Sequence, residues 1–129
     1  MKLLFFAFIS FLVSACSLFD SGVDQIVDDY EVSWIDLPEE RALQKGEQLI
    51  PPYVFAAGHN SRFIFAKRHK LILINGQQEI DKSVVYYYII ERTKKSFQDK
   101  PVYGPLSKET FIKKCAEIGV EQPKFDLSY

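Results

Sequence analysis

The sequence is poor in the residues that build the commonest catalytic and metal sites. Its 129 residues include two cysteines, two histidines and six glycines, with no Gly-rich phosphate loop, no G-x-S-x-G elbow and no H-E-x-x-H pair. Neither His59 nor His69 has a second histidine or cysteine at metal-ligand spacing. We therefore expect no metal, no cofactor and no catalytic residue, and predict that the protein is not an enzyme.

An excess of charge of one sign is also lacking. Sixteen basic and seventeen acidic residues give a net charge of -1, which argues against a nucleic-acid binder, and 47% hydrophobic residues argue against a disordered chain. The net charge is small because two oppositely charged segments cancel. Residues 16–47 hold 2 basic and 9 acidic residues, and residues 62–114 hold 12 basic and 5 acidic residues. Either the basic part faces an anionic partner such as lipid headgroups or envelope polymer, or the acidic segment packs beside the basic strands.

Long apolar runs are missing except at the start. Leu3 to Val13 is apolar apart from Ser10 and follows Met1-Lys2, a pattern typical of a secretory signal peptide and too short to span a bilayer. We predict that residues 1–15 are removed.

The residues behind this run are Val13-Ser14-Ala15-Cys16, which resemble the lipobox of bacterial lipoproteins. The resemblance implies that Cys16 receives a diacylglyceryl group, that cleavage precedes it, and that its new amino group is acylated. Several acyl chains make a stable membrane anchor where one chain is marginal. The resemblance implies a protein anchored to the bacterial cell membrane, in the outer membrane of a Gram-negative cell because Ser17 is not aspartate. The alternative is an ordinary secretory signal followed by a cysteine.

Lipidation of Cys16 leaves Cys115 without a disulfide partner. Cys115 with His59 or His69 would form a nucleophile and base, but its place on the apolar stripe of a predicted helix is typical of a small hydrophobic residue.

The mature chain divides into a predicted flexible tether at 16–29 and one domain at 30–129. Alternating or aromatic and β-branched runs predict strands, and Asn75-Gly76 predicts a turn. The predicted strands cover residues 30–36, 53–57, 62–69, 71–74 and 84–90, with 42–43 either a short strand or a turn of helix and 77–82 an exposed loop.

A helix is predicted after Ser107, which is a natural N-cap, with Leu106 and Phe111 as a hydrophobic staple and Gly119 as the stop. Its apolar face comprises Phe111, Ile112, Cys115 and Ile118. The short connections favour an α+β fold, an antiparallel meander with this helix on one face.

Tyrosines and basic residues on the central strands suggest a surface for a partner. Tyr86 and Tyr88 point to one side of a regular strand, and the basic cluster nearby includes Lys67 and Arg68. We interpret these four residues as a candidate surface for an envelope protein or polymer, although aromatic rows on strands are usually core.

Taken with the lipobox, these segments resemble a family of small bacterial lipoproteins of unknown function. The resemblance rests on YEVSWID at 30–36, FIFAK at 63–67, YYYII at 86–90, and YGPLS at 103–107 followed by Phe111. It implies no catalytic residue. The leading hypothesis is a lipid-anchored, non-enzymatic interaction or structural module of the envelope, and the alternative is an inhibitor or immunity-type protein that binds an envelope enzyme.

Overall fold

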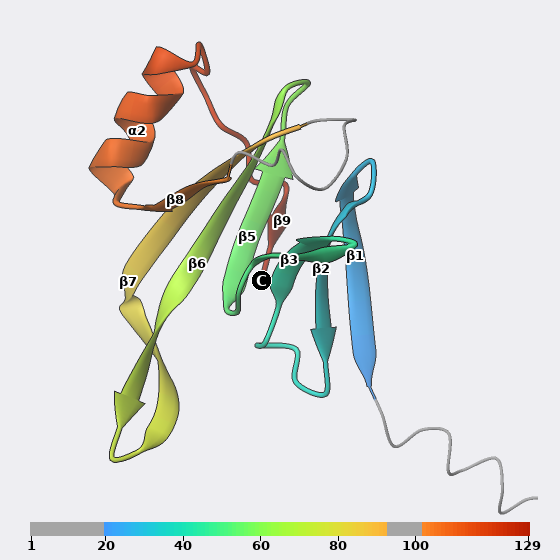
Figure 1. Cartoon of the computed structure of the whole chain (residues 1–129), viewed down its shortest axis with the longest axis vertical. Coiled ribbons are helices and arrows are strands. Elements are labelled where there is room, and N and C mark those ends of the chain that lie inside the picture. Colours follow the sequence, from blue (N-terminus) through green and yellow to red (C-terminus); the bar gives the residue numbers. More distant parts are fainter. Residues whose placement is uncertain (1–19, 93–101) are drawn as a thin grey trace, which may run out of the picture.

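Nine β-strands and one α-helix form over residues 20–92 and 102–129, which are the residues that the computed structural model describes (Figure 1). All strand pairs are antiparallel. The predicted α+β class is therefore confirmed. The strands form two sheets where a single meander was expected, and the break falls at Pro51-Pro52, whose missing N–H groups cannot continue a ladder.

The first sheet has four strands in chain order: β1 (Ser21–Val27), β2 (Tyr30–Ile35), β3 (Ala42–Lys45) and β4 (Glu47–Ile50). Strand β2 shows the predicted alternation, with Tyr30 and Val32 buried. The two readings of residues 42–43 are resolved in favour of a strand.

Strand β1 corrects the predicted tether. Residues 21–27 have little apolar periodicity and belong to the predicted tether at 16–29, yet they pair with β2 from Ser21 opposite Ile35 to Val27 opposite Tyr30. An edge strand needs backbone pairing and only a few buried side chains, so its sequence can be polar. The ordered domain therefore begins before residue 30.

The second sheet has five strands in the order β8 (Val102–Leu106), β7 (Gln77–Glu91), β6 (Phe63–Ile74), β5 (Val54–His59) and β9 (Leu127–Ser128). The predicted loop at 77–82 is wrong, because these residues begin β7. Asn75 and Gly76 have φ of 51° and 78°, as a two-residue hairpin turn requires, and the ladder starts immediately with Ile74 opposite Gln77. The hydrogen bonds between β6 and β7 therefore make residues 77–82 a strand in spite of their polar composition.

Helix α2 (Lys108–Glu117) begins and ends as predicted. Thr110 N donates to the Ser107 hydroxyl at 3.2 Å, and Gly119 has a φ of 81°. Phe111 and Cys115 are buried, but Ile112 is 57% exposed, so its predicted place on the buried face is wrong. The sheet contacts only a narrow stripe of this short helix.

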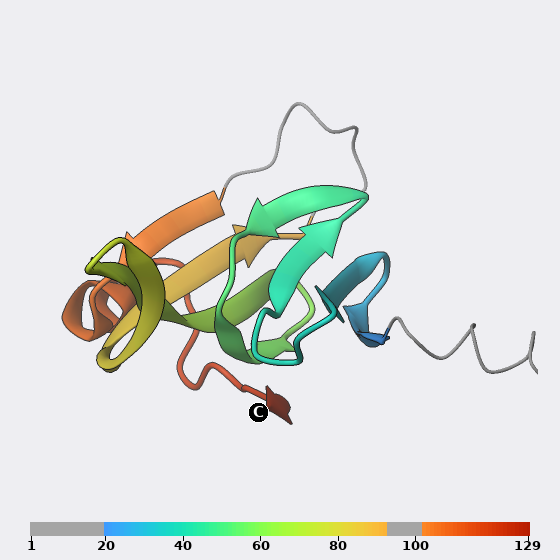
Figure 2. The same cartoon turned by 90° about the horizontal axis from the view of Figure 1, so that it is seen from below.

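Two apolar cores result, one on each face of the five-stranded sheet. Figure 2 shows α2 and the four-stranded sheet on opposite sides of it. The core between the sheets contains Tyr30, Val32, Leu43, Ile50, Val54, Ala57, Ile64, Ala66, Tyr88 and Ile90. The core under α2 contains Phe63, Phe65, Ile89, Phe111, Cys115 and Val120. The four-stranded sheet therefore covers the face that the helix leaves free.

Candidate functional site

The four residues predicted to form a partner surface do not form one. Arg68 pairs directly opposite Tyr86, and Tyr88 is next along the same face, toward the four-stranded sheet. Tyr88 is only 4% exposed, and its hydroxyl accepts a hydrogen bond from Arg68 Nη1 at 3.0 Å. Lys67 lies on the other face, with Nζ 4.4 Å from the centroid of the Phe125 ring. Tyr88 and Arg68 are therefore part of the packing between the sheets.

The histidines and Cys115 have separate surroundings. Cys115 is buried in the core under α2, and that burial raises the pKa of its thiol. His59 Nδ1 lies 3.3 Å from the Asn60 carbonyl oxygen, whereas the His69 ring stacks on Phe55 with centroids 4.0 Å apart. Within the part of the chain that the structure describes, neither histidine therefore lies in the surroundings of Cys115, where it could act as a general base.

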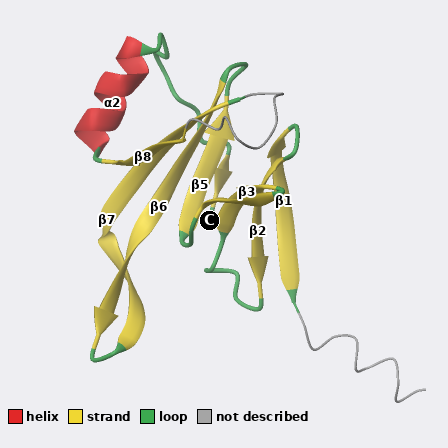
Figure 3. Cartoon of the chain, in the orientation of Figure 1, coloured by secondary structure: helices red, strands yellow, loops and turns green. Residues whose placement is uncertain are grey.

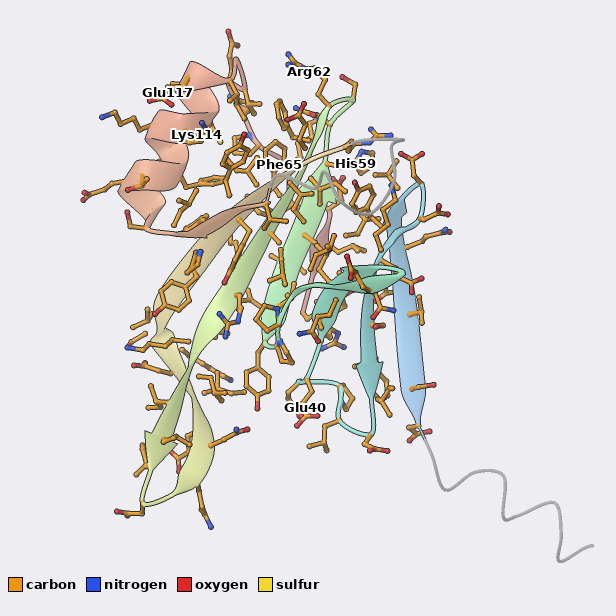
Figure 4. The ribbon with its side chains drawn as sticks, viewed as in Figure 1. Glu40, His59, Arg62, Phe65, Lys114 and Glu117 are labelled. Carbon is orange, nitrogen blue, oxygen red and sulfur yellow. The ribbon has the colours of Figure 1, made fainter. Side chains whose placement is uncertain are left out.

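A hollow of about 210 Å³ lies where five segments meet: the loop after β2, the start of β5, the middle of β6, the first part of β7 and the C-terminal residue. It is lined by Glu39, Arg41, Tyr53, Val54, Phe55, His69, Ile80, Lys82 and Tyr129. A second hollow of about 430 Å³ shares Glu39, Tyr53 and Ile80 with it and adds Leu37, Glu40, Gln78 and Glu79. We call the two together the hairpin cleft. Figure 4 labels Glu40 far from Lys114 and Glu117 of α2, so the cleft lies away from the helix.

Backbone hydrogen bonds join the segments that surround the cleft. They run from Val54 N to the Arg41 oxygen (2.8 Å), from His69 N to the Tyr53 oxygen (3.0 Å) and from Tyr129 N to the Phe55 oxygen (2.9 Å). Each bond links segments far apart in the sequence. These backbone hydrogen bonds therefore fix the positions of the segments that line the cleft.

Aromatic rings form much of the cleft wall. Phe55 and His69 stack nearly parallel, with 12° between their planes. The Arg41 guanidinium carbon lies 3.7 Å from the centroid of the Tyr129 ring, within the range of a cation–π contact. The Tyr129 hydroxyl donates to Asp24 Oδ2 at 2.5 Å, which ties the C-terminal residue to β1.

The surroundings of the cleft shift the pKa values of two of its groups. Burial, followed by the contact with Asp24, raises the pKa of Tyr129 to about 12 and keeps its hydroxyl a donor. Burial is also the main cause that lowers the pKa of His69, with a smaller effect of Lys82 in the same direction and an opposing hydrogen bond to the Val84 backbone. The imidazole is therefore neutral at pH 7.

Two buried polar atoms of the cleft residues lack hydrogen-bond partners. Of the four such side-chain atoms found in residues 20–92 and 102–129, one is Arg41 Nε and one is His69 Nδ1. A buried polar atom left unpaired costs about 1 to 3 kcal/mol. The protein's own packing therefore leaves these two atoms for ordered water or a bound group to pair with.

The cleft is divided by charge. Arg41 and Lys82 line the first hollow, whereas Glu40 and Glu79 line the second and Glu39 lines both. Aromatic walls with charges of both signs suit recognition of a mixed polar and apolar group. None of the residues that line the two hollows is a serine, threonine or cysteine.

Of these residues the sequence singled out only His69. Arg41 stands in a segment with no clear predicted structure, Tyr53 opens a predicted strand without being marked as a site residue, and Tyr129 follows the predicted helix with no pattern of its own. Their proximity depends on pairing between distant strands, so no local signal was available.

Cys16 lies outside the described residues. Among residues 20–92 and 102–129, no helix has the length and hydropathy needed to cross a membrane. The same residues contain no cluster of three or more histidine, cysteine, aspartate or glutamate side chains suited to a metal ion.

Comparison with known proteins places the chain in one family. Neither the curated proteins nor the solved structures include a match to it. A family model described as a protein of unknown function, DUF3997, matches residues 25–127. The match extends from within β1 to the start of β9 and so includes both sheets and the helix. The chain therefore belongs to DUF3997, a family of proteins of unknown function.

Proposed function

We propose that the protein is a lipid-anchored component of the bacterial cell envelope, with Cys16 as the acylated residue. The support is the sequence around the cleavage position: a short positive start, an eleven-residue apolar run and Val-Ser-Ala-Cys directly behind it. Anchoring by several acyl chains would hold the domain at the membrane without a spanning helix. Mass spectrometry of the mature N-terminus tests this, and an unmodified Cys16 refutes it.

The anchored domain acts in this proposal as a non-enzymatic interaction module. The observation that carries it is the hairpin cleft, where Arg41 Nε and His69 Nδ1 stay unpaired beside aromatic rings. Both atoms are buried, so a partner pairs with them only when the side chains shift slightly. A segment of an envelope protein suits the cleft, because a peptide offers amide donors and acceptors together with side chains of both charges.

Crosslinking in intact cells followed by copurification tests the cleft. We expect Arg41→Gln and Glu39→Gln each to reduce recovery of the crosslinked partner, because both residues line the cleft. Lys113→Gln is the matched control, since Lys113 is exposed on α2 and removal of its charge leaves the cleft intact. If all three variants recover as much crosslinked partner as the wild type, the cleft is excluded as the partner site.

An inhibitor or immunity-type role is the second candidate. The separation of Arg41 and Lys82 from Glu40 and Glu79 within one cleft favours it, because charge patterns of both signs give selectivity among enzyme partners. Identification of the crosslinked protein decides between the two roles. A hydrolase whose activity rises when the protein is deleted supports the inhibitor, and a partner without catalytic activity supports the structural module.

A further inference from the structure

Two pairs of exposed apolar side chains lie toward the same end of the molecule. Seven large apolar side chains are exposed in the described residues, and four of them lie at the end where β1 begins, which we call the basal end. They are Ile35 (70% exposed), Leu37 (52%), Leu73 (71%) and Ile74 (43%). Single exposed apolar residues are ordinary on protein surfaces, so the position of these two pairs relative to the start of the domain carries the argument.

Ile35 and Leu37 lie beside the first described residues of the chain. Ile35 pairs with Ser21, the first residue of β1. Asp36 N donates to the Asp20 carbonyl oxygen at 2.9 Å, and Leu37 N donates to the Ile35 carbonyl oxygen at 2.9 Å. These contacts hold both side chains at the point from which the chain leads back toward Cys16.

Leu73 and Ile74 lie at the tip of the β6–β7 hairpin. Pairing of β6 with β5 ends at Arg68 and pairing of β7 with β8 ends at Tyr87, so the rest of the hairpin is a two-stranded ribbon. Figure 3 shows this ribbon extending beyond the other strands of its sheet, toward the same end as the start of β1. A ribbon with two free edges is only marginally stable in water, so apolar residues at its tip gain from a surface that covers them.

The length of chain before β1 identifies that surface. Cys16 precedes Ser21 by five residues, which span at most about 18 Å when extended. We propose that the basal end rests on the membrane that holds the anchor, with Leu73, Ile74, Ile35 and Leu37 at the boundary between headgroups and acyl chains. This inference rests on the proposed acylation of Cys16.

The charges at the basal end indicate which lipids take part. Asp36, Glu39 and Glu40 lie in the loop that follows Ile35, and the hairpin carries Glu79 and Asp81 beside Lys70 and Lys82. With acidic side chains in the majority, anionic headgroups gain nothing here and the contact is apolar. The polar turn at Asn75-Gly76 keeps the insertion shallow, within about 5 to 10 Å of the surface.

Site-specific labelling of the lipidated full chain in phosphatidylcholine vesicles tests the inference. A polarity-sensitive fluorophore is attached to Leu73→Cys or, as the matched control, to Ile112→Cys, which is equally a surface site (57% exposed) but lies on α2 at the other end. Because both side chains are exposed, neither substitution disturbs a core, and buried Cys115 does not compete for the label. A nitroxide lipid serves as the quencher.

We expect the label at residue 73 to lose emission and shift to the blue, the label at residue 112 to do neither, and anionic lipid to add nothing. Equal quenching at both positions, with Cys16 acylated, overturns the membrane contact but leaves the anchor standing. Self-quenching of the label at residue 73 that disappears when the protein is diluted among vesicles shows that the hairpin tip contacts a second copy of the chain. That result also overturns the membrane contact. An unmodified Cys16 overturns the anchor and removes the ground for this placement.

Discussion

Replacement of Arg68 by methionine separates a structural role from a surface role. Arg68 donates from Nη1 to the Tyr88 hydroxyl at 3.0 Å and from Nε to the Pro52 carbonyl oxygen at 2.6 Å. Hydrogen bonds that involve a charged group contribute about 1.5 to 3 kcal/mol each, and partial exposure of Arg68 places these at the lower end. We expect Arg68→Met to reduce the free energy of unfolding by about 2 to 3 kcal/mol, whereas an ordinary surface substitution stays within about 0.5 kcal/mol.

Urea unfolding followed by circular dichroism measures this loss. Arg62→Met is the matched control, because Arg62 is exposed. Within residues 20–92 and 102–129 its guanidinium contacts only the face of the Phe63 ring, 5.2 Å from the centroid, which is worth at most about 1 kcal/mol. A double-mutant cycle with Tyr88→Phe isolates the Arg68–Tyr88 bond, for which we expect a coupling of about 1 kcal/mol. Stability of Arg68→Met within about 0.5 kcal/mol of the wild type, or a coupling of zero, would refute the reasoning.

Three further predictions concern stability. Phe65→Ala should cost about 3 to 5 kcal/mol in chemical unfolding, since the ring is fully buried in the core under α2; a loss below about 1 kcal/mol would contradict that core. Gly58→Ala should cost at least about 2 kcal/mol and expose the C-terminal segment to protease, because a Cβ there would lie 1.9 Å from the Lys124 carbonyl oxygen; unchanged proteolysis would argue against this contact. The folded-state pKa of His69 lies below its ordinary value of 6.5, so the unfolded chain takes up the proton first and stability falls as the pH drops through 6.5. Unfolding midpoints at pH 7.5 and 5.5 test this, and a His69→Gln variant with the same pH dependence as the wild type would assign the effect elsewhere.

The hairpin cleft and the proposed membrane contact share one end of the molecule. Leu37 lines the cleft and belongs to the basal apolar group, and Gln78, which also lines it, pairs with Leu73 at the hairpin tip. A partner of the cleft would therefore meet the domain close to the bilayer surface. Access to the cleft would therefore differ between soluble partners and partners that are themselves held at the membrane.

Local features of the chain were predictable because they depend on neighbouring residues. Ser107 caps α2, Gly119 follows it, Asn75-Gly76 turns the hairpin and Tyr30 and Val32 alternate on β2, each as its own backbone preference or spacing dictates. The α+β class follows from the same signals. The lipobox is likewise a local pattern, and acylation of Cys16 stays a prediction.

Only the tertiary structure decided how these pieces meet. Polar β1 becomes a strand because β2 supplies its hydrogen bonds, and Arg68 joins the packing between the sheets because its guanidinium donates to the Tyr88 hydroxyl and the Pro52 carbonyl oxygen. The cleft forms from segments that are joined by backbone bonds across the sheet and share no pattern in the sequence. Composition and periodicity report each residue's own preference, whereas pairing between distant strands and burial between two sheets depend on the whole chain, and these place the site.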